Sequence, residues 1–102
     1  MSGGRIDFGK INRAALADAE RVVRAFLPDG VRQGNEWVAR NPLRDDRHRG
    51  SLKVNLLTGR GADFSVGVRF GDLVGLAAYV SGCDQRTAAL RLADALGVAP
   101  FL

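Results

Sequence analysis

The chain has 102 residues, enough for one hydrophobic core and typical of a single domain, and its 46% hydrophobic and 25% charged residues exclude a disordered or collagen-like protein. No apolar run approaches the roughly 18 residues that a membrane span needs, and MSGGRIDFGK at the N-terminus lacks the apolar segment of a signal peptide. We therefore expect a cytoplasmic protein with no membrane partner.

The net charge indicates which partner to expect, and the numbers of cysteine and histidine indicate whether a metal can be bound. The net charge is +4, and thirteen of the fifteen basic residues are arginine, whose planar guanidinium group binds phosphate and stacks on bases. Nucleic acid is therefore the first partner to consider, although the coding bias of a GC-rich genome would also enrich arginine. One cysteine, Cys83, and one histidine, His48, cannot supply four zinc ligands, so we expect neither structural zinc nor another cofactor.

The first part of the chain, residues 1–30, is expected to form a helix. The segment RAALADAERVVRAFL after Asn12 is rich in helix-forming residues, and its apolar residues recur at helical spacing. Asn12 is a plausible N-cap, and Pro28, Asp29 and Gly30 form a stop signal. The apolar stripe of this amphipathic helix comprises Leu16, Ala19, Val23, Phe26 and Leu27.

The middle part, residues 31–71, has short runs separated by turn residues, a pattern typical of antiparallel strands. Gly34 and Asn35 suit a tight turn before a strand at 37–40, and Gly59-Arg60-Gly61 fits a hairpin turn better than a phosphate-binding loop.

One of these strands shows the alternation that separates two faces of a sheet. Leu52 and Val54 should face one side, and the other side should carry Ser51, Lys53 and Asn55. Because residues 31–71 hold eight basic and four acidic side chains, we expect the positive charge on the exposed face of the sheet or on its loops.

The last part, residues 72–102, predicts two helices, the first capped by Asp72 and the second starting at Asp84 and ending at Gly97. Cys83, between them, is interpreted as a packing residue rather than a reactive thiol. The two ends of the chain, 1–4 and 99–102, are expected to fray. The apolar stripes comprise Leu73, Leu76, Ala77 and Val80 on the first helix and Ala88, Leu92, Ala95 and Leu96 on the second.

Four short motifs follow one another along the middle of the chain: Asn41-Pro42-Leu43-Arg44, Arg49-Gly50-Ser51-Leu52, Asp63-Phe64-Ser65-Val66 and Phe70-Gly71-Asp72. In their order they resemble the zinc-ribbon module at the N-terminus of bacterial and phage DNA primases. That family carries a Cys-Pro-Phe-His loop, a Thr-Pro-Ser-Phe strand start, a Cys-Phe-Gly-Cys turn and a Gly-Gly-Asp entry into a helix. The resemblance covers residues 34–97 and implies a small zinc-ribbon-like sheet, a helix pair and a role in binding template DNA.

All four positions of the family's zinc ligands are substituted here. Asn41 and Val66 stand where that family has cysteines, Arg44 stands at its histidine, and Asp63 stands at its remaining cysteine. The resemblance therefore implies no zinc. We expect Arg44 and Asp63 to pair across the former site, Val66 to fill its space and Asn41 to hydrogen-bond a turn; the alternative is that Arg44 and Asp63 are two unrelated surface charges.

The candidate nucleic-acid site combines basic side chains with an aromatic residue. Trp37 is a candidate for stacking on a base, although it is also the natural core residue of so small a sheet, and Phe64 is expected in the core. Asp45, Asp46 and His48 are interpreted as turn residues rather than as a metal or acid–base cluster. The basic residues of the site are Arg40, Arg44, Arg47, Arg49, Lys53, Arg60 and Arg69.

The fold expected is α+β in one domain of residues 1–102, with an N-terminal helix (1–30), a small antiparallel sheet with basic loops (31–71) and a C-terminal helix pair (72–102). The function expected is a zinc-free, primase-type module that binds single-stranded DNA in the replication of a phage, plasmid or mobile element, with a primase, polymerase or helicase as partner. The alternative is an adaptor that docks a replication protein without binding DNA. We do not expect an enzyme, because no hydrolase signature accompanies His48 and the chain is too short for the family's polymerizing domain.

Overall fold

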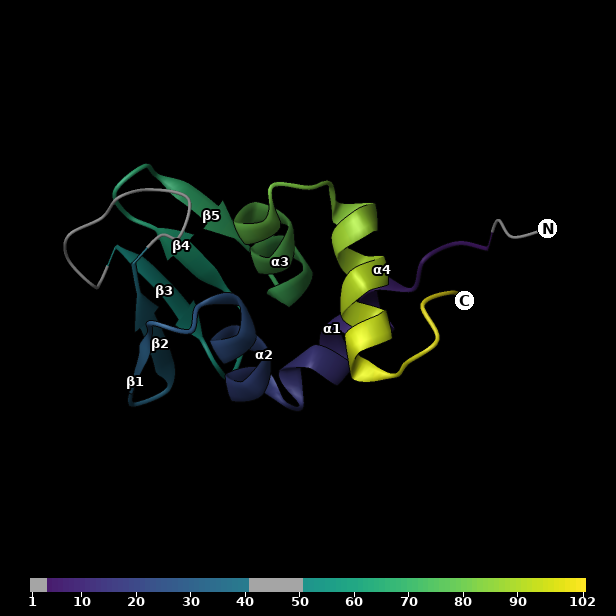
Figure 1. The fold of residues 1–102 in the computed structure, drawn as a ribbon, viewed down its shortest axis with the longest axis horizontal. Coiled ribbons are helices and arrows are strands. Elements are labelled where there is room, and N and C mark those ends of the chain that lie inside the picture. Colours follow the sequence, from purple (N-terminus) through teal and green to yellow (C-terminus); the bar gives the residue numbers. More distant parts are fainter. Residues whose placement is uncertain (1–3, 41–50) are drawn as a thin grey trace.

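The structure, a computed structural model, describes residues 4–40 and 51–102 and has extents of 47 × 24 × 19 Å. An antiparallel sheet occupies one end and the helices occupy the middle and the other end (Figure 1). This α+β arrangement, with a C-terminal helix pair, confirms the expected fold class. The helices are α1 (Phe8–Leu16), α2 (Ala19–Phe26), α3 (Leu73–Ser81) and α4 (Gln85–Leu96), and the strands are β1 (Val31–Gln33), β2 (Glu36–Ala39), β3 (Leu52–Asn55), β4 (Gly61–Asp63) and β5 (Val68–Phe70).

The sheet has the strand order β1-β2-β3-β4-β5, so neighbours in sequence are neighbours in space. The first turn lies where the sequence predicts it, since residues 34–35 join β1 to β2; the connection of β3 to β4, residues 56–60, begins earlier than the predicted turn at 59–61, and Gly61 already belongs to β4. Gly34 adopts a positive φ of 63°, a conformation that favours glycine. The alternation in β3 is also confirmed, because Leu52 and Val54 are buried whereas Lys53 and Asn55 are half-buried.

The N-terminal helical region differs from the single helix expected after Asn12. α1 begins earlier, with Asp7 as its N-cap accepting a hydrogen bond from the backbone N–H of Lys10 at 3.0 Å. Asn12 lies inside α1, where its Oδ1 accepts from the backbone N–H of Val74 at 3.0 Å. The helix breaks at Ala17 and Asp18, and α2 then ends at Phe26, just before the predicted stop signal.

The break lets the two helices pack differently. α1 contacts both α3 and α4, whereas α2 contacts α1 and α3, and its buried residues Val22 and Val23 join the same core as Trp37 of the sheet. Tertiary packing therefore overrides the continuous helical pattern of the sequence.

The C-terminal helices begin and end where the sequence predicts. Asp72 Oδ1 accepts from the N–H of Gly75 at 2.7 Å, Asp84 Oδ1 accepts from the N–H of Thr87 at 2.7 Å, and both helices end at a glycine in the left-handed conformation. The hydrogen bonds from the backbone and side chain of Thr87 hold the pKa of Asp84 below its ordinary value, and the charge of Arg86 adds to this effect.

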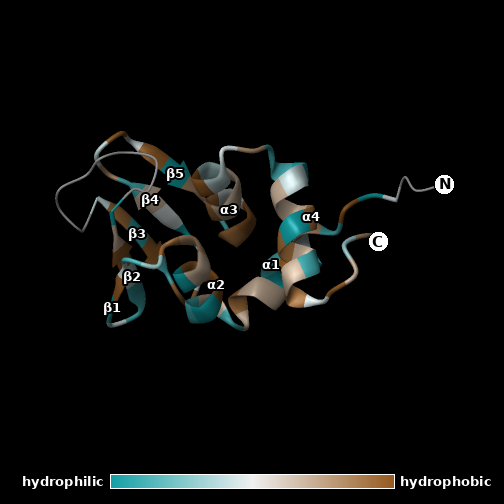
Figure 2. Cartoon of the chain, in the orientation of Figure 1, coloured by the Kyte–Doolittle hydropathy of each residue, from teal (hydrophilic) through white to brown (hydrophobic). Residues whose placement is uncertain are grey.

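The predicted apolar stripes of this helix pair are correct in most positions. Ala95, however, is exposed, and Val80 and Leu96 are only half-buried. α3 is more deeply enclosed than an amphipathic helix would be, because it contacts all three other helices and β5. Figure 2 shows α4 alternating between hydrophilic and hydrophobic segments, as expected of a helix with one face in solvent. The buried residues are Leu73, Val74, Gly75, Leu76, Ala77 and Ala78 in α3 and Ala88, Ala89, Leu92 and Ala93 in α4.

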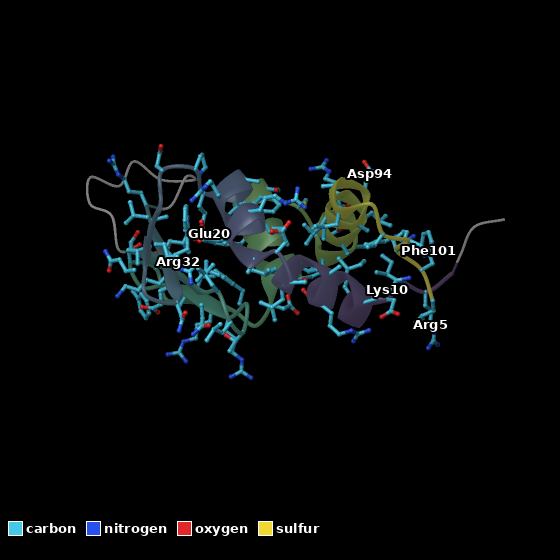
Figure 3. All side chains as sticks on the ribbon, turned by 90° about the horizontal axis from the view of Figure 1, so that it is seen from below. Arg5, Lys10, Glu20, Arg32, Asp94 and Phe101 are labelled. Atoms are coloured by element: carbon cyan, nitrogen blue, oxygen red, sulfur yellow. The ribbon has the colours of Figure 1, made fainter. Side chains whose placement is uncertain are left out.

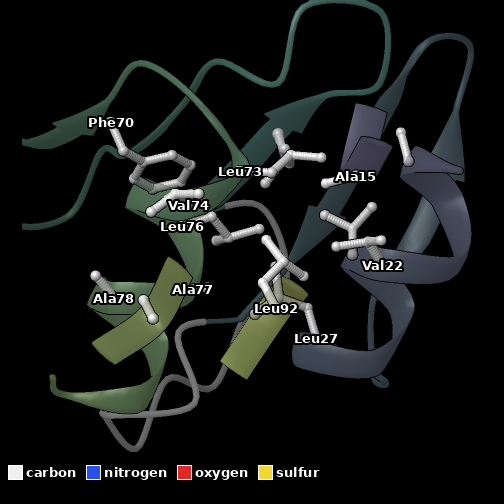
Figure 4. Packing of buried hydrophobic residues seen from close by; sticks show 14 of the residues in the cluster. Ala15, Val22, Leu27, Phe70, Leu73, Val74, Leu76, Ala77, Ala78 and Leu92 are labelled. Atoms are coloured by element: carbon white, nitrogen blue, oxygen red, sulfur yellow. The ribbon is translucent and has the colours of Figure 1, made fainter. Parts of the chain in front are cut away.

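The core lies between the helices and the inner face of the sheet. Leu76, Leu92 and Leu27 meet there (Figure 4). Trp37 of β2 belongs to the sheet side of this core. Its indole Nε1 donates a 2.9 Å hydrogen bond to the backbone oxygen of Leu27. Packing of this kind stabilises the described fold through apolar burial.

Residues 5–7 pair with residues 100–102, so the expected fraying of 99–102 is wrong, whereas residues 1–3 of the other expected frayed segment lie outside the described residues. Ile6 and Phe101 form an antiparallel bridge, flanked by hydrogen bonds from the N–H of Asp7 to the oxygen of Pro100 (2.9 Å) and from the N–H of Leu102 to the oxygen of Arg5 (2.8 Å). These two segments lie side by side near α1 and α4 (Figure 1). Over the described residues, no helix has both the length and the apolar character that crossing a bilayer requires.

Candidate nucleic-acid interface

The register of the sheet defines an inner face and an open face. Trp37, Val54, Gly61 and Phe70 pair across four strands on the inner face. One residue further along, the row Val38, Lys53, Ala62 and Arg69 lies on the opposite side, which we call the open face; in this row Val38 is buried, Lys53 and Ala62 are half-buried and Arg69 is exposed. The helices lie on the inner side (Figure 1). Lys53 and Arg69, two residues of the predicted site, therefore share one row of the open face.

Two further predicted residues belong to this face by the same alternation. Arg40 follows the buried Ala39 of β2, and Arg60 precedes Gly61 of β4. The backbone oxygen of Arg60 accepts from the N–H of Asn55 at 2.7 Å, which continues the β3–β4 ladder to Arg60. Arg40, Arg60 and Arg69 are exposed, and Lys53 is half-buried.

Among the described residues, the cations of the open face form no ion pair with an acid. In the part of the chain that the structure describes, the ion pairs are Arg21–Asp18, Arg24–Glu20 and Arg32–Glu20, and none involves a basic residue of the open face. Arg32 turns instead towards α2, where its Nη1 lies 2.8 Å from Glu20 Oε1 (Figure 3). Four cations on one face give a positive potential that attracts a polyanion.

The remaining predicted basic residues, Arg44, Arg47 and Arg49, lie outside the described residues. The same holds for Asn41 and for the cluster of Asp45, Asp46 and His48. Their predicted roles, including the pairing of Arg44 with Asp63, therefore remain predictions.

Trp37 does not belong to the open face. Its side chain is 2% exposed, it donates to Leu27, and the guanidinium carbon of Arg24 lies 5.2 Å from its ring centre. A base cannot stack on this ring while it is buried, so the proposed stacking role of Trp37 is wrong and its interpretation as a core residue is confirmed.

Asp63 and Val66 both lie within the described residues, but only Val66 differs from the arrangement expected around the former metal site. Asp63 is fully buried, and its Oδ1 accepts from the N–H of Ser65 (3.1 Å) and the hydroxyl of Ser65 (2.6 Å), while its Oδ2 accepts from the hydroxyl of Tyr79 at 3.1 Å. Asp63 is therefore no surface charge. Val66 is 47% exposed in the β4–β5 turn, so it fills no buried space and that expectation is wrong.

Phe64 is the residue of this site that the sequence misplaced. It is 65% exposed rather than in the core, and the ammonium of Lys53 lies 5.9 Å from its ring centre. Alternation could have indicated this position, since Phe64 follows the buried Asp63 and shares the side of Ala62. The strong prior for burying phenylalanine masked that signal.

Two of the hollows formed by the described residues lie beside the helices. A cleft of about 420 Å³ between β5 and α3 is lined by polar groups including Arg69, Asp72 and Tyr79, and half-buried Cys83 borders it while packing against the core. A smaller hollow of about 150 Å³ lies between α2 and α4. The described segments contain no cluster of three or more His, Cys, Asp or Glu residues that could hold a metal ion.

No protein-family model matches the chain, and no curated protein matches it.

Proposed function

We propose that this chain is a zinc-free, primase-type module that binds single-stranded DNA through the open face of its sheet. The observation that supports this function best is the cross-strand row that aligns Lys53 with Arg69, with Arg40 and Arg60 on the same side. Basic grooves of this kind bind the phosphate backbone whatever the sequence of the strand. Arg44, Arg47 and Arg49 belong to the proposed site on the sequence alone.

The proposed setting is the replication of a phage, plasmid or mobile element in the cytoplasm. The chain would hold single-stranded DNA for a primase, polymerase or helicase and would not itself catalyse a reaction. This part of the proposal rests on the resemblance of residues 34–97 to the primase module.

The test is a titration of labelled single- and double-stranded DNA at several salt concentrations. A double variant of the open face, Lys53→Gln with Arg69→Gln, is compared with Arg13→Gln plus Arg91→Gln, which removes the same charge from exposed positions on α1 and α4. Because each lost phosphate contact removes about 0.7 from the slope of log affinity against log salt, the open-face variant should lose about 1.4 from the slope. The control should keep the wild-type slope. Equal effects of the two variants would show that net charge, and not this face, governs binding.

A second candidate function is a protein-interaction adaptor, favoured by the hollow between α2 and α4. Its lining is mainly apolar and includes Phe26, Leu92 and Leu96, with Arg21 and Arg91 also contributing. An adaptor would bind nucleic acid weakly at every salt concentration, so the same titration separates the two functions.

A further inference from the structure

We infer that Phe64 is a stacking platform for an unpaired base and gives the open face its preference for single-stranded over double-stranded nucleic acid. This inference rests on the proposed function, because it assigns a second kind of contact to the same surface. It replaces Trp37, whose burial removes it from the site.

The exposure of Phe64 is the first supporting observation. A side chain of this size is normally buried, and Phe64 is 65% exposed on a face that already carries four cations. Its ring is therefore accessible to a flat partner. Bases offer such a partner once they are no longer paired, and every base presents a π-face.

The backbone beneath this ring is held in place. The N–H of Phe64 donates to the oxygen of Ser51 at 2.7 Å, which extends the β3–β4 ladder by one residue beyond β4. On its other side the turn is closed by a 2.9 Å hydrogen bond from the N–H of Gly67 to the oxygen of Asp63. Phe64 is therefore presented by the sheet itself.

A buried network fixes the same turn from within. The carboxylate of Asp63, at zero exposure, accepts from the backbone and hydroxyl of Ser65 and from the hydroxyl of Tyr79 on α3. This network ties the residues on both sides of Phe64 to the helical layer. An exposed aromatic ring on a fixed backbone loses little further freedom when it binds, which favours affinity.

Lys53 contacts the ring of Phe64 and also belongs to the cations of the open face. Its ammonium lies 5.9 Å from the ring centre of Phe64, within the range of a cation–π contact. Because Lys53 also lies in the row that contains Arg69, a strand that stacks a base on Phe64 meets cations beside that base. A duplex can contact only the cations of the open face, because its bases are stacked on one another and cannot stack on Phe64.

The experiment compares three variants on two strands of equal length, one of ordinary nucleotides and one of abasic spacers. Phe64→Leu removes the aromatic ring but keeps an apolar side chain, Phe64→Trp enlarges the ring, and Leu57→Ala is the control, since Leu57 is 64% exposed in the turn at the opposite end of β4. Circular dichroism checks that each variant is folded.

For the ordinary strand, Phe64→Leu should weaken binding by about 5- to 150-fold, the range expected for the loss of one stacked base. Phe64→Trp should bind as tightly as the wild type or more tightly, and Leu57→Ala should leave the affinity unchanged. On the abasic strand and on duplex DNA, Phe64→Leu should bind as the wild type does. A 2-aminopurine base in the ordinary strand should be quenched by the wild type and less by Phe64→Leu.

The two proposals fail in different ways. If the wild type binds both strands with a steep salt dependence and Phe64→Leu changes nothing, the proposed function stands and the stacking role of Phe64 is overturned. If Phe64→Leu weakens binding to ordinary and abasic strands equally, the ring acts on the fold of the site and stacking is again overturned. If the wild type binds neither strand, the proposed function is overturned and the stacking role with it.

Discussion

Replacing Gly61 by alanine should destabilise the sheet strongly. Gly61 lies in β4 opposite Phe70, and an added Cβ would lie 2.4 Å from Phe70 Cε2 and 2.5 Å from the backbone oxygen of Lys53. Contacts below 3.0 Å essentially never occur for a real Cβ, so the ring or the β3–β4 ladder must move. The Phe70 ring lies against Gly61 of β4, 6.2 Å from the ring of Tyr79 of α3, centre to centre, and borders the cleft between β5 and α3.

The magnitude follows from two terms. Overpacking in a dense interior costs about 1–3 kcal/mol, and a weakened ladder hydrogen bond adds about 1 kcal/mol. We therefore expect a loss of about 2–4 kcal/mol, a large share of the roughly 5–15 kcal/mol that stabilises a typical domain. For a chain of this size the loss corresponds to a fall in Tm on the order of 10–20 °C.

The assay is urea and thermal unfolding followed by circular dichroism. Gly71→Ala is the matched control, because Gly71 is exposed, has no atom within 4 Å of an added Cβ and does not have a positive φ. That variant should be neutral or more stable by up to about 1 kcal/mol, through the lower entropy of its unfolded chain. A Gly61→Ala protein within about 0.5 kcal/mol of the wild type would refute the close packing of Phe70 on β4.

Three further changes have defined outcomes. Tyr79→Phe removes the 3.1 Å hydrogen bond to buried Asp63 and should lower the free energy of unfolding by about 1–3 kcal/mol in urea titrations; an unchanged midpoint would contradict the role of that bond. Leu76→Ala, at a fully buried position of α3, should lose about 2–5 kcal/mol, and a loss below 1 kcal/mol would show that the site is less well packed than described. Hydrogen bonds from Thr87 lower the folded-state pKa of Asp84, so its carboxylate contributes stability that is complete above 3.8 and is lost as pH falls through the lower folded pKa. Relative to Asp84→Asn, the wild type should thus lose stability in thermal unfolding as the pH falls below 3.8, and parallel curves for the two proteins would contradict the lowered pKa.

The sequence predicted the elements whose signals are local. Asp72 and Asp84 cap α3 and α4 as expected, because an N-cap is set by a side chain and backbone groups three residues away. The two faces of β3 also follow directly from alternation. Where residues close together in the chain determine the local structure, the sequence pattern was sufficient to predict it.

Features decided by distant contacts were missed. Asn12 has the side chain of an N-cap, but here it serves α3 through the N–H of Val74, sixty-two residues away. The pairing of residues 5–7 with 100–102 has no local signal either.

The candidate site shows the same division between local and distant effects. The open-face positions of Lys53 and Arg69 follow from alternation, whereas the exchange of roles between Trp37 and Phe64 does not. Trp37 is buried because α2 and Leu27 cover its side of the sheet. Phe64 is exposed because the helices lie on the other side.

The bridge between Ile6 and Phe101 also determines whether the domain can be circularly permuted. Partners in an antiparallel bridge lie about 5 Å apart, so a short linker could join residue 102 to residue 5 without crossing the surface of the protein. A circular permutant opened at the exposed turn around Leu57 would then keep each strand pairing of the described sheet. Tension that pulls residue 5 away from residue 102 would open this pairing one hydrogen bond at a time, so the same closure that tolerates permutation makes this part of the molecule mechanically weak.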